Sequence, residues 1–421
     1  MVRFTALAAL VLLIPPHAAR GGELPKSEPA EVGLSGQRLA RIQPALAKLV
    51  NDGKIPGGVA VVARHGKLAY VTTFGYRELA NKTPMTENTI FAIASMTKPI
   101  TCTALMTLVE QGKLGLDDPV SKFIPEMKDL RVLGSAKDDT ATEVATVPAR
   151  RPITIRDLLS HTSGFTYEGI LPVLSVNARL GRSYERAGVS RRDFKTIQEQ
   201  VARLANVPLA HQPGEGWTYG LSHDVLGRVI EVVSGKTFDQ YLQERILEPL
   251  DMHDTSFFVP EGQRDRVATI YVMGNGGTLT AMPKNYGSKT FFAGGHGLFS
   301  TARDYTRFAQ MINNGGELNG VRILKPETIA TMTTNQIGER DARIGEFSLG
   351  KYGLGFGLVL APVTPGGQPV LNRYYWAGYY STNFWIDPRH DLVAVFMTQV
   401  LPTNYGGANE LFRRVVDSAI Q

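Results

Sequence analysis

Strand-like segments near both ends of the chain constrain the fold more than any other feature of the sequence. Residues 59–75 consist of two β-rich runs joined around His65-Gly-Lys67, which predicts a hairpin. Residues 383–398 repeat this pattern around a turn at Asp387–Asp391. Helical patterns occupy stretches between these hairpins, at residues 155–160, 194–205, 224–234, 238–246 and 302–314. We therefore expect an α+β fold, in which an antiparallel sheet built from both termini is flanked by helices.

The same order of elements predicts how the chain is divided. We expect one domain over residues 23–421, with a sheet lobe at about 23–100 and 290–421 and an inserted, mostly helical lobe at about 101–289. The 421 residues, 43% hydrophobic and 20% charged, are typical of a globular protein. A net charge of +6 without a lysine- or arginine-rich block argues against nucleic-acid binding. A cleft is expected where the lobes meet.

A Ser-x-x-Lys motif stands before an apolar helix pattern. Ser95-Met-Thr-Lys98 precedes residues 100–112, whose apolar residues recur at helical spacing up to a glycine at the expected C-cap. Residues three apart on a helix share one face, so Ser95 and Lys98 can meet. A lysine whose pKa is lowered can take the proton of a serine hydroxyl. The pattern favours serine acyl-transfer chemistry, and the N–H of Ser95 at a helix N-terminus can form half of an oxyanion hole.

Other interpretations of these residues remain open at this point. Ser95 alone would also suit a helix N-cap. A second Ser348-Leu-Gly-Lys351 copy lies in a glycine-rich strand or loop, where residues three apart point to opposite faces, so we expect no second site there. Asp224 fits either a supporting carboxylate near the site or a charge at a helix start. His161 and His296 are expected to be structural hydrogen-bonding residues.

Several motifs occur in an order that resembles a known superfamily. They are Ser95-Met-Thr-Lys98, Leu158-Leu-Ser-His-Thr-Ser-Gly-Phe165, Trp217-Thr-Tyr-Gly-Leu-Ser222 with Asp224-Val-Leu-Gly227, Gly294-Gly-His-Gly-Leu-Phe-Ser-Thr301 and Trp376-Ala-Gly378. Together they resemble the serine β-lactamase and penicillin-binding-protein superfamily, and most of all its class C β-lactamase-like esterases, called family VIII. The resemblance covers residues 30–415 and implies a β-lactamase/transpeptidase-like fold.

The resemblance also implies roles for individual residues. It makes Ser95 the nucleophile, Lys98 the general base, and Tyr219 the group that passes the proton to the leaving group and helps activate water. Substrate would bind along the third motif, which is Trp376, Ala377 and Gly378. The backbone N–H of Tyr379 would complete the oxyanion hole.

Two departures from the β-lactamase pattern favour the esterase branch. The chain has Tyr219-Gly-Leu where β-lactamases have Tyr-x-Asn, and Trp376-Ala-Gly378 where they have Lys-Thr-Gly. The missing lysine removes a cation that would hold the carboxylate of a β-lactam or a peptide terminus. A tryptophan there suits an uncharged apolar group.

We therefore expect a serine hydrolase that cleaves short-chain carboxylic esters through an acyl-enzyme. No Gly-x-Ser-x-Gly motif supports the α/β-hydrolase route to the same activity. A β-lactamase, a D-alanyl-D-alanine peptidase or a small-amide hydrolase would share the mechanism. A non-catalytic binding protein on the same fold is the alternative from another class.

The N-terminus and the remaining composition complete the prediction. Residues 1–22 combine an early arginine with a short apolar run, which is typical of a signal peptide and predicts a periplasmic or secreted protein. No other segment is expected to span a membrane. The single cysteine, Cys102, excludes an internal disulfide and is expected to be buried. The histidine spacing supports no metal site, and we expect no cofactor. The sequence does not specify the oligomeric state.

Overall fold

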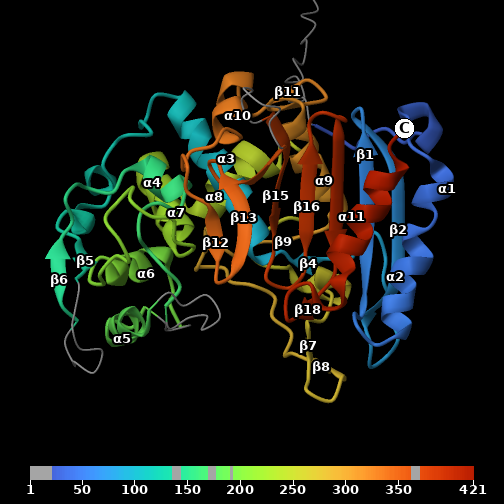
Figure 1. Cartoon of the computed structure of the whole chain (residues 1–421), viewed down its shortest axis with the longest axis horizontal. Coiled ribbons are helices and arrows are strands. Elements are labelled where there is room, and N and C mark those ends of the chain that lie inside the picture. Colours follow the sequence, from blue (N-terminus) through green and yellow to red (C-terminus); the bar gives the residue numbers. More distant parts are fainter. Residues whose placement is uncertain (1–20, 135–143, 169–176, 190–192, 362–369) are drawn as a thin grey trace, which may run out of the picture.

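The structure confirms the α+β architecture with a large antiparallel sheet. It is a computed structural model that describes residues 21–134, 144–168, 177–189, 193–361 and 370–421 (Figure 1). Residues 1–20, most of the predicted signal peptide, lie outside this range, so the signal peptide and the location of the protein stay predictions. In the described residues no helix is both long and apolar enough to cross a membrane.

The main sheet has nine strands, and their order brings the two ends of the chain together. The order is β12-β13-β14-β15-β16-β17-β1-β2-β3. These strands are β1 (Gly57–Arg64), β2 (Lys67–Glu78), β3 (Thr83–Pro84), β12 (Ala342–Ile344), β13 (Phe347–Tyr352), β14 (Gly357–Ala361), β15 (Val370–Ala377), β16 (Asn383–Asp387) and β17 (Leu392–Met397). All neighbours are antiparallel, and β1 pairs β17 from Val59↔Met397 to Arg64↔Leu392. Both predicted hairpins are therefore present and lie side by side.

Smaller sheets and the helices complete the fold. The short strands are β4 (Phe91–Ala92), β5 (Arg131–Leu133), β6 (Thr146–Pro148), β7 (Tyr271–Met273), β8 (Leu279–Ala281), β9 (Phe299–Ser300), β10 (Glu317–Leu318), β11 (Val321–Arg322) and β18 (Val400–Leu401). The α-helices are α1 (Gly36–Leu39), α2 (Ile42–Asn51), α3 (Thr97–Glu110), α4 (Ile155–Leu159), α5 (Ala178–Arg186), α6 (Ile197–Leu204), α7 (Ser222–Ser234), α8 (Phe238–Leu242), α9 (Ala302–Asn313), α10 (Pro326–Met332) and α11 (Ala408–Ala419). The 3₁₀ turns are η1 (Pro29–Val32), η2 (Ala94–Met96), η3 (Val120–Lys122), η4 (Pro125–Met127), η7 (Glu261–Arg266) and η8 (Tyr405–Gly407), and η6 (Gln243–Leu247) is a π turn.

The sheet separates two hydrophobic cores, because successive side chains of a strand point to opposite faces. On β1, Val59 and Val61 belong to one core, whereas Ala60 and Val62 belong to the other. The terminal helices α1, α2 and α11 cover the second face, where Phe412 of α11 packs against Trp385. Figure 1 shows α4–α7 grouped beyond the β12 edge of the sheet.

Two local expectations need correction. The polar composition of residues 131–151, with Gly134, Lys137, Asp138 and Asp139, predicts an exposed loop. The segment instead contains the β5–β6 hairpin, in which Arg131 Nε donates to Thr146 Oγ1 at 2.6 Å. Its residues 135–143 lie outside the described range. The helix expected over 238–246 is α-helical only to Leu242 and continues as the π turn η6. Tertiary packing decided both segments, because their sequence patterns are short.

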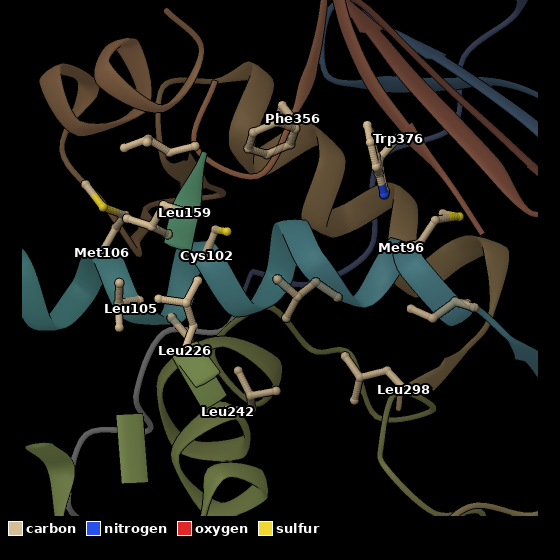
Figure 2. Close-up of a cluster of buried hydrophobic side chains, with 14 of the residues drawn as sticks. Met96, Cys102, Leu105, Met106, Leu159, Leu226, Leu242, Leu298, Phe356 and Trp376 are labelled. Carbon is tan, nitrogen blue, oxygen red and sulfur yellow. The ribbon is translucent and has the colours of Figure 1, made fainter. Parts of the chain in front are cut away.

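Helix α3 runs through the middle of the first core. Every residue from Thr97 to Leu108 is buried, as expected of a helix surrounded by protein on all sides. Figure 2 shows Leu226 of α7 and Leu242 of α8 on one side of α3, and Phe356 and Trp376 on the other. This packing fixes the position of the helix that begins just after Ser95.

Replacing Leu226 by alanine should destabilise this core. Leu226 is fully buried, so Leu226→Ala is expected to lower the free energy of unfolding by about 2–5 kcal/mol through lost burial and a residual cavity. Val232 lies on the same helix with 40% of its surface exposed, and Val232→Ala should change the free energy of unfolding by about 0.5 kcal/mol or less. Urea unfolding followed by circular dichroism measures both, and equal effects would contradict the packing described for α3.

Candidate functional site

Ser95 lies in the tight turn that joins β4 to α3. The turn is the 3₁₀ segment η2, and α3 begins at Thr97, two residues after Ser95. Ala94 has φ +44°, a conformation that a residue with a Cβ adopts at a cost and that is concentrated at functional sites. Tyr305 donates its hydroxyl proton to the carbonyl of Met96 at 2.8 Å, which holds the far end of the turn. Ser95 itself is half-buried, so its hydroxyl can meet a substrate.

Lys98 is fully buried beside this serine. Its Nζ lies 3.2 Å from Ser95 Oγ, 3.0 Å from Tyr167 Oη and 2.8 Å from the carbonyl oxygen of Gly295. All three partners are neutral oxygen atoms, and in the described residues Lys98 forms no ion pair. The i,i+3 spacing therefore brings serine and lysine within hydrogen-bond distance, as the sequence predicted.

Tyr219 also lies against Lys98, but through its ring. The amine is 4.6 Å from the centroid of the Tyr219 ring, and Tyr219 is 8% exposed. The hydroxyl that contacts the amine belongs to Tyr167, which stands two residues after the Leu158–Phe165 motif. Sequence reasoning missed Tyr167, and its place beside that motif was the available signal. Burial, then the neighbouring Tyr219 and Asp224, raise the pKa of Tyr167, so its phenol stays protonated.

The third motif lies at the end of β15, and its three residues occupy different surroundings. The Trp376 ring is 3% exposed and lies 5.6 Å from the ring of Tyr219 on the inner face. Ala377 instead lines, with Tyr375, a hollow on the opposite face of the sheet. A Cβ at Gly378 would lie 2.4 Å from the carbonyl oxygen of Ile93, so only glycine allows this close approach. Gly378 thereby places the half-buried Tyr379 beside the turn that carries Ser95.

Two buried histidines pack beside the ring of Tyr219. The rings of His161 and His223 lie 4.5 Å apart, and His161 also packs against Tyr219 at 4.9 Å. Burial lowers the pKa of both imidazoles well below the usual value, with the neighbouring Lys98 adding to the effect, so both rings are neutral. The backbone carbonyl of His161 accepts a hydrogen bond from Thr218 N–H at 2.9 Å, which fixes the segment leading to Tyr219. His296 is exposed over part of its surface, but burial of its imidazole lowers the pKa of this ring too.

The remaining candidates play no part in this arrangement. Lys351 of the second Ser-x-x-Lys copy donates to the carbonyl oxygens of Glu339 and Arg340, at 2.8 and 2.9 Å, rather than to Ser348. Cys102 is buried, and burial raises the pKa of its thiol, which leaves it unreactive. The part of the chain that the structure describes has no group of three or more histidine, cysteine or acidic residues arranged to hold a metal ion.

The fold is that of the serine β-lactamase and penicillin-binding-protein superfamily. The solved structure of EstCE1, described as a hydrolase with promiscuous acyltransferase activity, is similar with a TM-score of 0.74 and 26% identity over 91% of this chain and 99% of that one. Residues 42–417 match the family described as Beta-lactamase. The chain belongs to this family.

Proteins with similar sequences indicate the class of activity. Esterase EstB of Burkholderia gladioli is 31% identical over 397 residues, which cover 88% of this chain and 93% of EstB. An uncharacterised protein of Mycobacterium tuberculosis is 36% identical over 375 residues, covering 86% of this chain and 90% of the relative. The named relatives support hydrolase or acyl-transferring activity of the esterase type.

Proposed function

We propose that this protein is a serine carboxylic-ester hydrolase that acts on short-chain esters through an acyl-enzyme. The observation that carries the proposal is the buried amine of Lys98 at 3.2 Å from the half-buried hydroxyl of Ser95. A general base must lie within hydrogen-bond reach of the proton it removes, and this pair meets that requirement. The similarity to an esterase supports the choice of esters as substrates.

The proposed reaction starts with the transfer of the Ser95 proton to Lys98 Nζ. Ser95 Oγ then attacks the ester carbonyl carbon, and the backbone N–H groups of Ser95 and Tyr379 stabilise the negative oxygen that forms. The proton passes from Lys98, with the phenols of Tyr167 and Tyr219 beside it, to the leaving alcohol. Water then attacks the acyl-enzyme by the same steps in reverse, with Lys98 again as the base.

The environment of the third motif favours an uncharged substrate. Trp376 occupies the position where β-lactamases have a lysine, and its buried ring packs against Tyr219 and Tyr352. An aromatic wall gains from contact with apolar acyl or alcohol groups and offers no charge to a carboxylate. We therefore expect esters to be cleaved much faster than β-lactams or peptides that end in a carboxylate.

Trapping the acyl-enzyme tests this proposal directly. Protein mixed with p-nitrophenyl butyrate and quenched in acid within milliseconds should gain the mass of one butyryl group, and peptide mapping should place it on Ser95. A chromogenic cephalosporin assayed in parallel should be cleaved slowly. Rapid cephalosporin cleavage would instead indicate a β-lactamase, and a label on another residue would refute the assignment of Ser95. Transfer of the butyryl group to an added alcohol would identify acyltransferase activity, which the description of EstCE1 also names.

The two tyrosines beside Lys98 should contribute unequally. Tyr219→Phe removes the proposed proton shuttle and should lower kcat for the ester by about 100- to 1,000-fold, within the range for general acid–base groups. Tyr167→Phe removes a hydrogen bond to Lys98 and should lower kcat by about 10-fold. Steady-state kinetics measure both. Tyr241→Phe is the control, because Tyr241 is also buried and its hydroxyl bonds to Thr107 in the core. If Tyr167→Phe were the more damaging change, the shuttle would be Tyr167.

A further inference from the structure

Asp224 is a buried carboxylate without a basic partner in the described part of the chain. Its side chain is 0% exposed, and Oδ1 accepts a hydrogen bond from the N–H of Gly295 at 3.2 Å. Oδ2 has no hydrogen-bond partner among the residues that the structure describes. Burying a carboxylate without a cation beside it is strongly unfavourable, so Asp224 is expected to lower the stability of the folded protein. A role in the chemistry of the site would explain why the fold keeps it.

One residue connects this carboxylate to Lys98. The N–H of Gly295 donates to Asp224, and the carbonyl oxygen of the same residue accepts from Lys98 Nζ at 2.8 Å. A Cβ on Gly295 would lie 2.8 Å from Asp224 Oδ2 and 3.2 Å from Tyr167 Oη, so both oxygens lie against this glycine. Asp224 therefore holds the residue that orients the amine, and its second oxygen lies against the same glycine as the Tyr167 hydroxyl that the amine also contacts.

We propose that Asp224 is a positioning residue for Lys98, which also stabilises the positive charge that Lys98 acquires during the reaction. The inference rests on the proposed function. When the proton moves from Ser95 Oγ to Nζ, a new bond forms between Oγ and the substrate carbonyl carbon and the amine becomes an ammonium. The proton later moves to the oxygen of the leaving alcohol as the bond between that oxygen and the carbonyl carbon breaks. A carboxylate at Asp224 lowers the energy of the state in which Lys98 is positive.

The other titratable side chains near Lys98 are phenols, imidazoles and a thiol rather than carboxylates. They are Tyr167 beyond α4, Tyr219 before α7, the adjacent rings of His161 and His223, Cys102 on α3, and His296. Burial keeps the pKa of Tyr167 and Cys102 raised and the pKa of His161 and His223 lowered, so these groups carry no charge near neutral pH. The carboxylate of Asp224 is therefore suited to balance an ammonium on Lys98.

The competing explanation is a charge in the first turn of a helix, because Asp224 is the third residue of α7. Asp304 provides a matched control. It is the third residue of α9, is 3% exposed and is paired with Arg307 at 2.7 Å, and its carboxylate also accepts from Asp254 N–H and the Thr255 hydroxyl rather than from Gly295. Asp224→Asn and Asp304→Asn each remove one buried first-turn charge with little change in shape.

Ester kinetics on the two full-length variants and the unchanged protein test the inference. In Asp224→Asn, kcat for p-nitrophenyl butyrate should fall by about 10- to 100-fold with little change in KM, because the lost stabilisation acts on the transition state. The dependence of kcat/KM on pH should also change, because the carboxylate that favours the positive charge in the transition state is gone. Asp304→Asn should keep both kcat and the pH profile. Its Tm should fall, whereas that of Asp224→Asn should stay level or rise.

The outcomes distinguish a wrong role for Asp224 from a wrong proposed function. An Asp224→Asn variant with unchanged kcat and an unmoved pH profile would overturn the inference and make Asp224 a helix-start charge only. Ester turnover that survives in folded Ser95→Ala would overturn the proposed function instead. If Asp224→Asn does not fold, Gly295→Ala tests the same contact, because the added methyl group meets Asp224 Oδ2. A folded Gly295→Ala protein with reduced kcat and a shifted pH profile would support the inference, and full activity would refute it.

Discussion

Ester hydrolysis should be lost when Ser95 is replaced by alanine. We expect kcat for p-nitrophenyl butyrate to fall by at least about a thousandfold, because removal of a serine nucleophile leaves only the contribution of binding and the oxyanion hole. Folding should be nearly unaffected, since Ser95 is half-buried and lies in a 3₁₀ turn outside α3. Steady-state kinetics and a thermal melt on the same preparation measure the two effects.

The chain offers a matched control for this variant. Ser348 belongs to the second Ser-x-x-Lys copy, which lies on β13, and the amine of Lys351 binds carbonyl oxygens there. Ser348→Ala should therefore keep full activity. If Ser95→Ala were folded and active, Ser95 would be a structural turn residue, and the protein would be a member of the family that uses another nucleophile or only binds its ligand.

The local patterns of the sequence predicted the parts of the fold that depend on local interactions. The hairpins at 59–75 and 383–398 are β1–β2 and β16–β17, because their turns and β-rich runs need no distant partner to be recognised. A single sheet built from both termini was predicted because each hairpin has an apolar face that must be buried, and the pairing of β1 with β17 joins the two hairpins in that sheet. Ser95 and Lys98 could be paired in advance because three residues separate them on a helical turn.

The contacts that complete the site depend on segments far apart in the sequence. Tyr167 and Gly295 are 69 and 197 residues from Lys98, so neither hydrogen bond follows from spacing. Asp224 stood near the expected site, but nothing in its neighbours revealed that Gly295 would bind it. Such contacts are determined by how the helical region folds back on α3, which sequence periodicity does not specify.

The third motif illustrates a different limit. Trp376, Ala377 and Gly378 were expected to bind substrate together, yet strand alternation sends Ala377 to the face opposite Trp376. That separation could have been inferred from the strand pattern alone. The close approach of Gly378 to Ile93 could not, because it requires β15 and the turn before Ser95 to meet.

Lys98→Met gives the sharpest test of how the serine is activated. Methionine retains an unbranched chain of similar length in a fully buried position but cannot accept a proton, so kcat should fall by about a thousandfold or more. Tyr167 and Gly295 would each lose a hydrogen bond, at about 1 kcal/mol apiece, while the cost of burying an amine disappears. We therefore expect the free energy of unfolding to change by no more than about 2 kcal/mol.

The matched control is Lys351→Met, which removes the amine of the second copy and should keep kcat, because Lys351 binds backbone carbonyls away from the site. Rapid-quench mass spectrometry should find no acyl group on Ser95 in Lys98→Met at times when the unchanged protein is fully acylated. Rapid acylation in this variant would mean that another base activates Ser95. The buried His161 and His223 are poor candidates, since their imidazoles lie behind Tyr219 rather than beside the serine. An activity that depends on Lys98 but not on Lys351 would therefore place the general base at the one Ser-x-x-Lys motif whose two side chains meet.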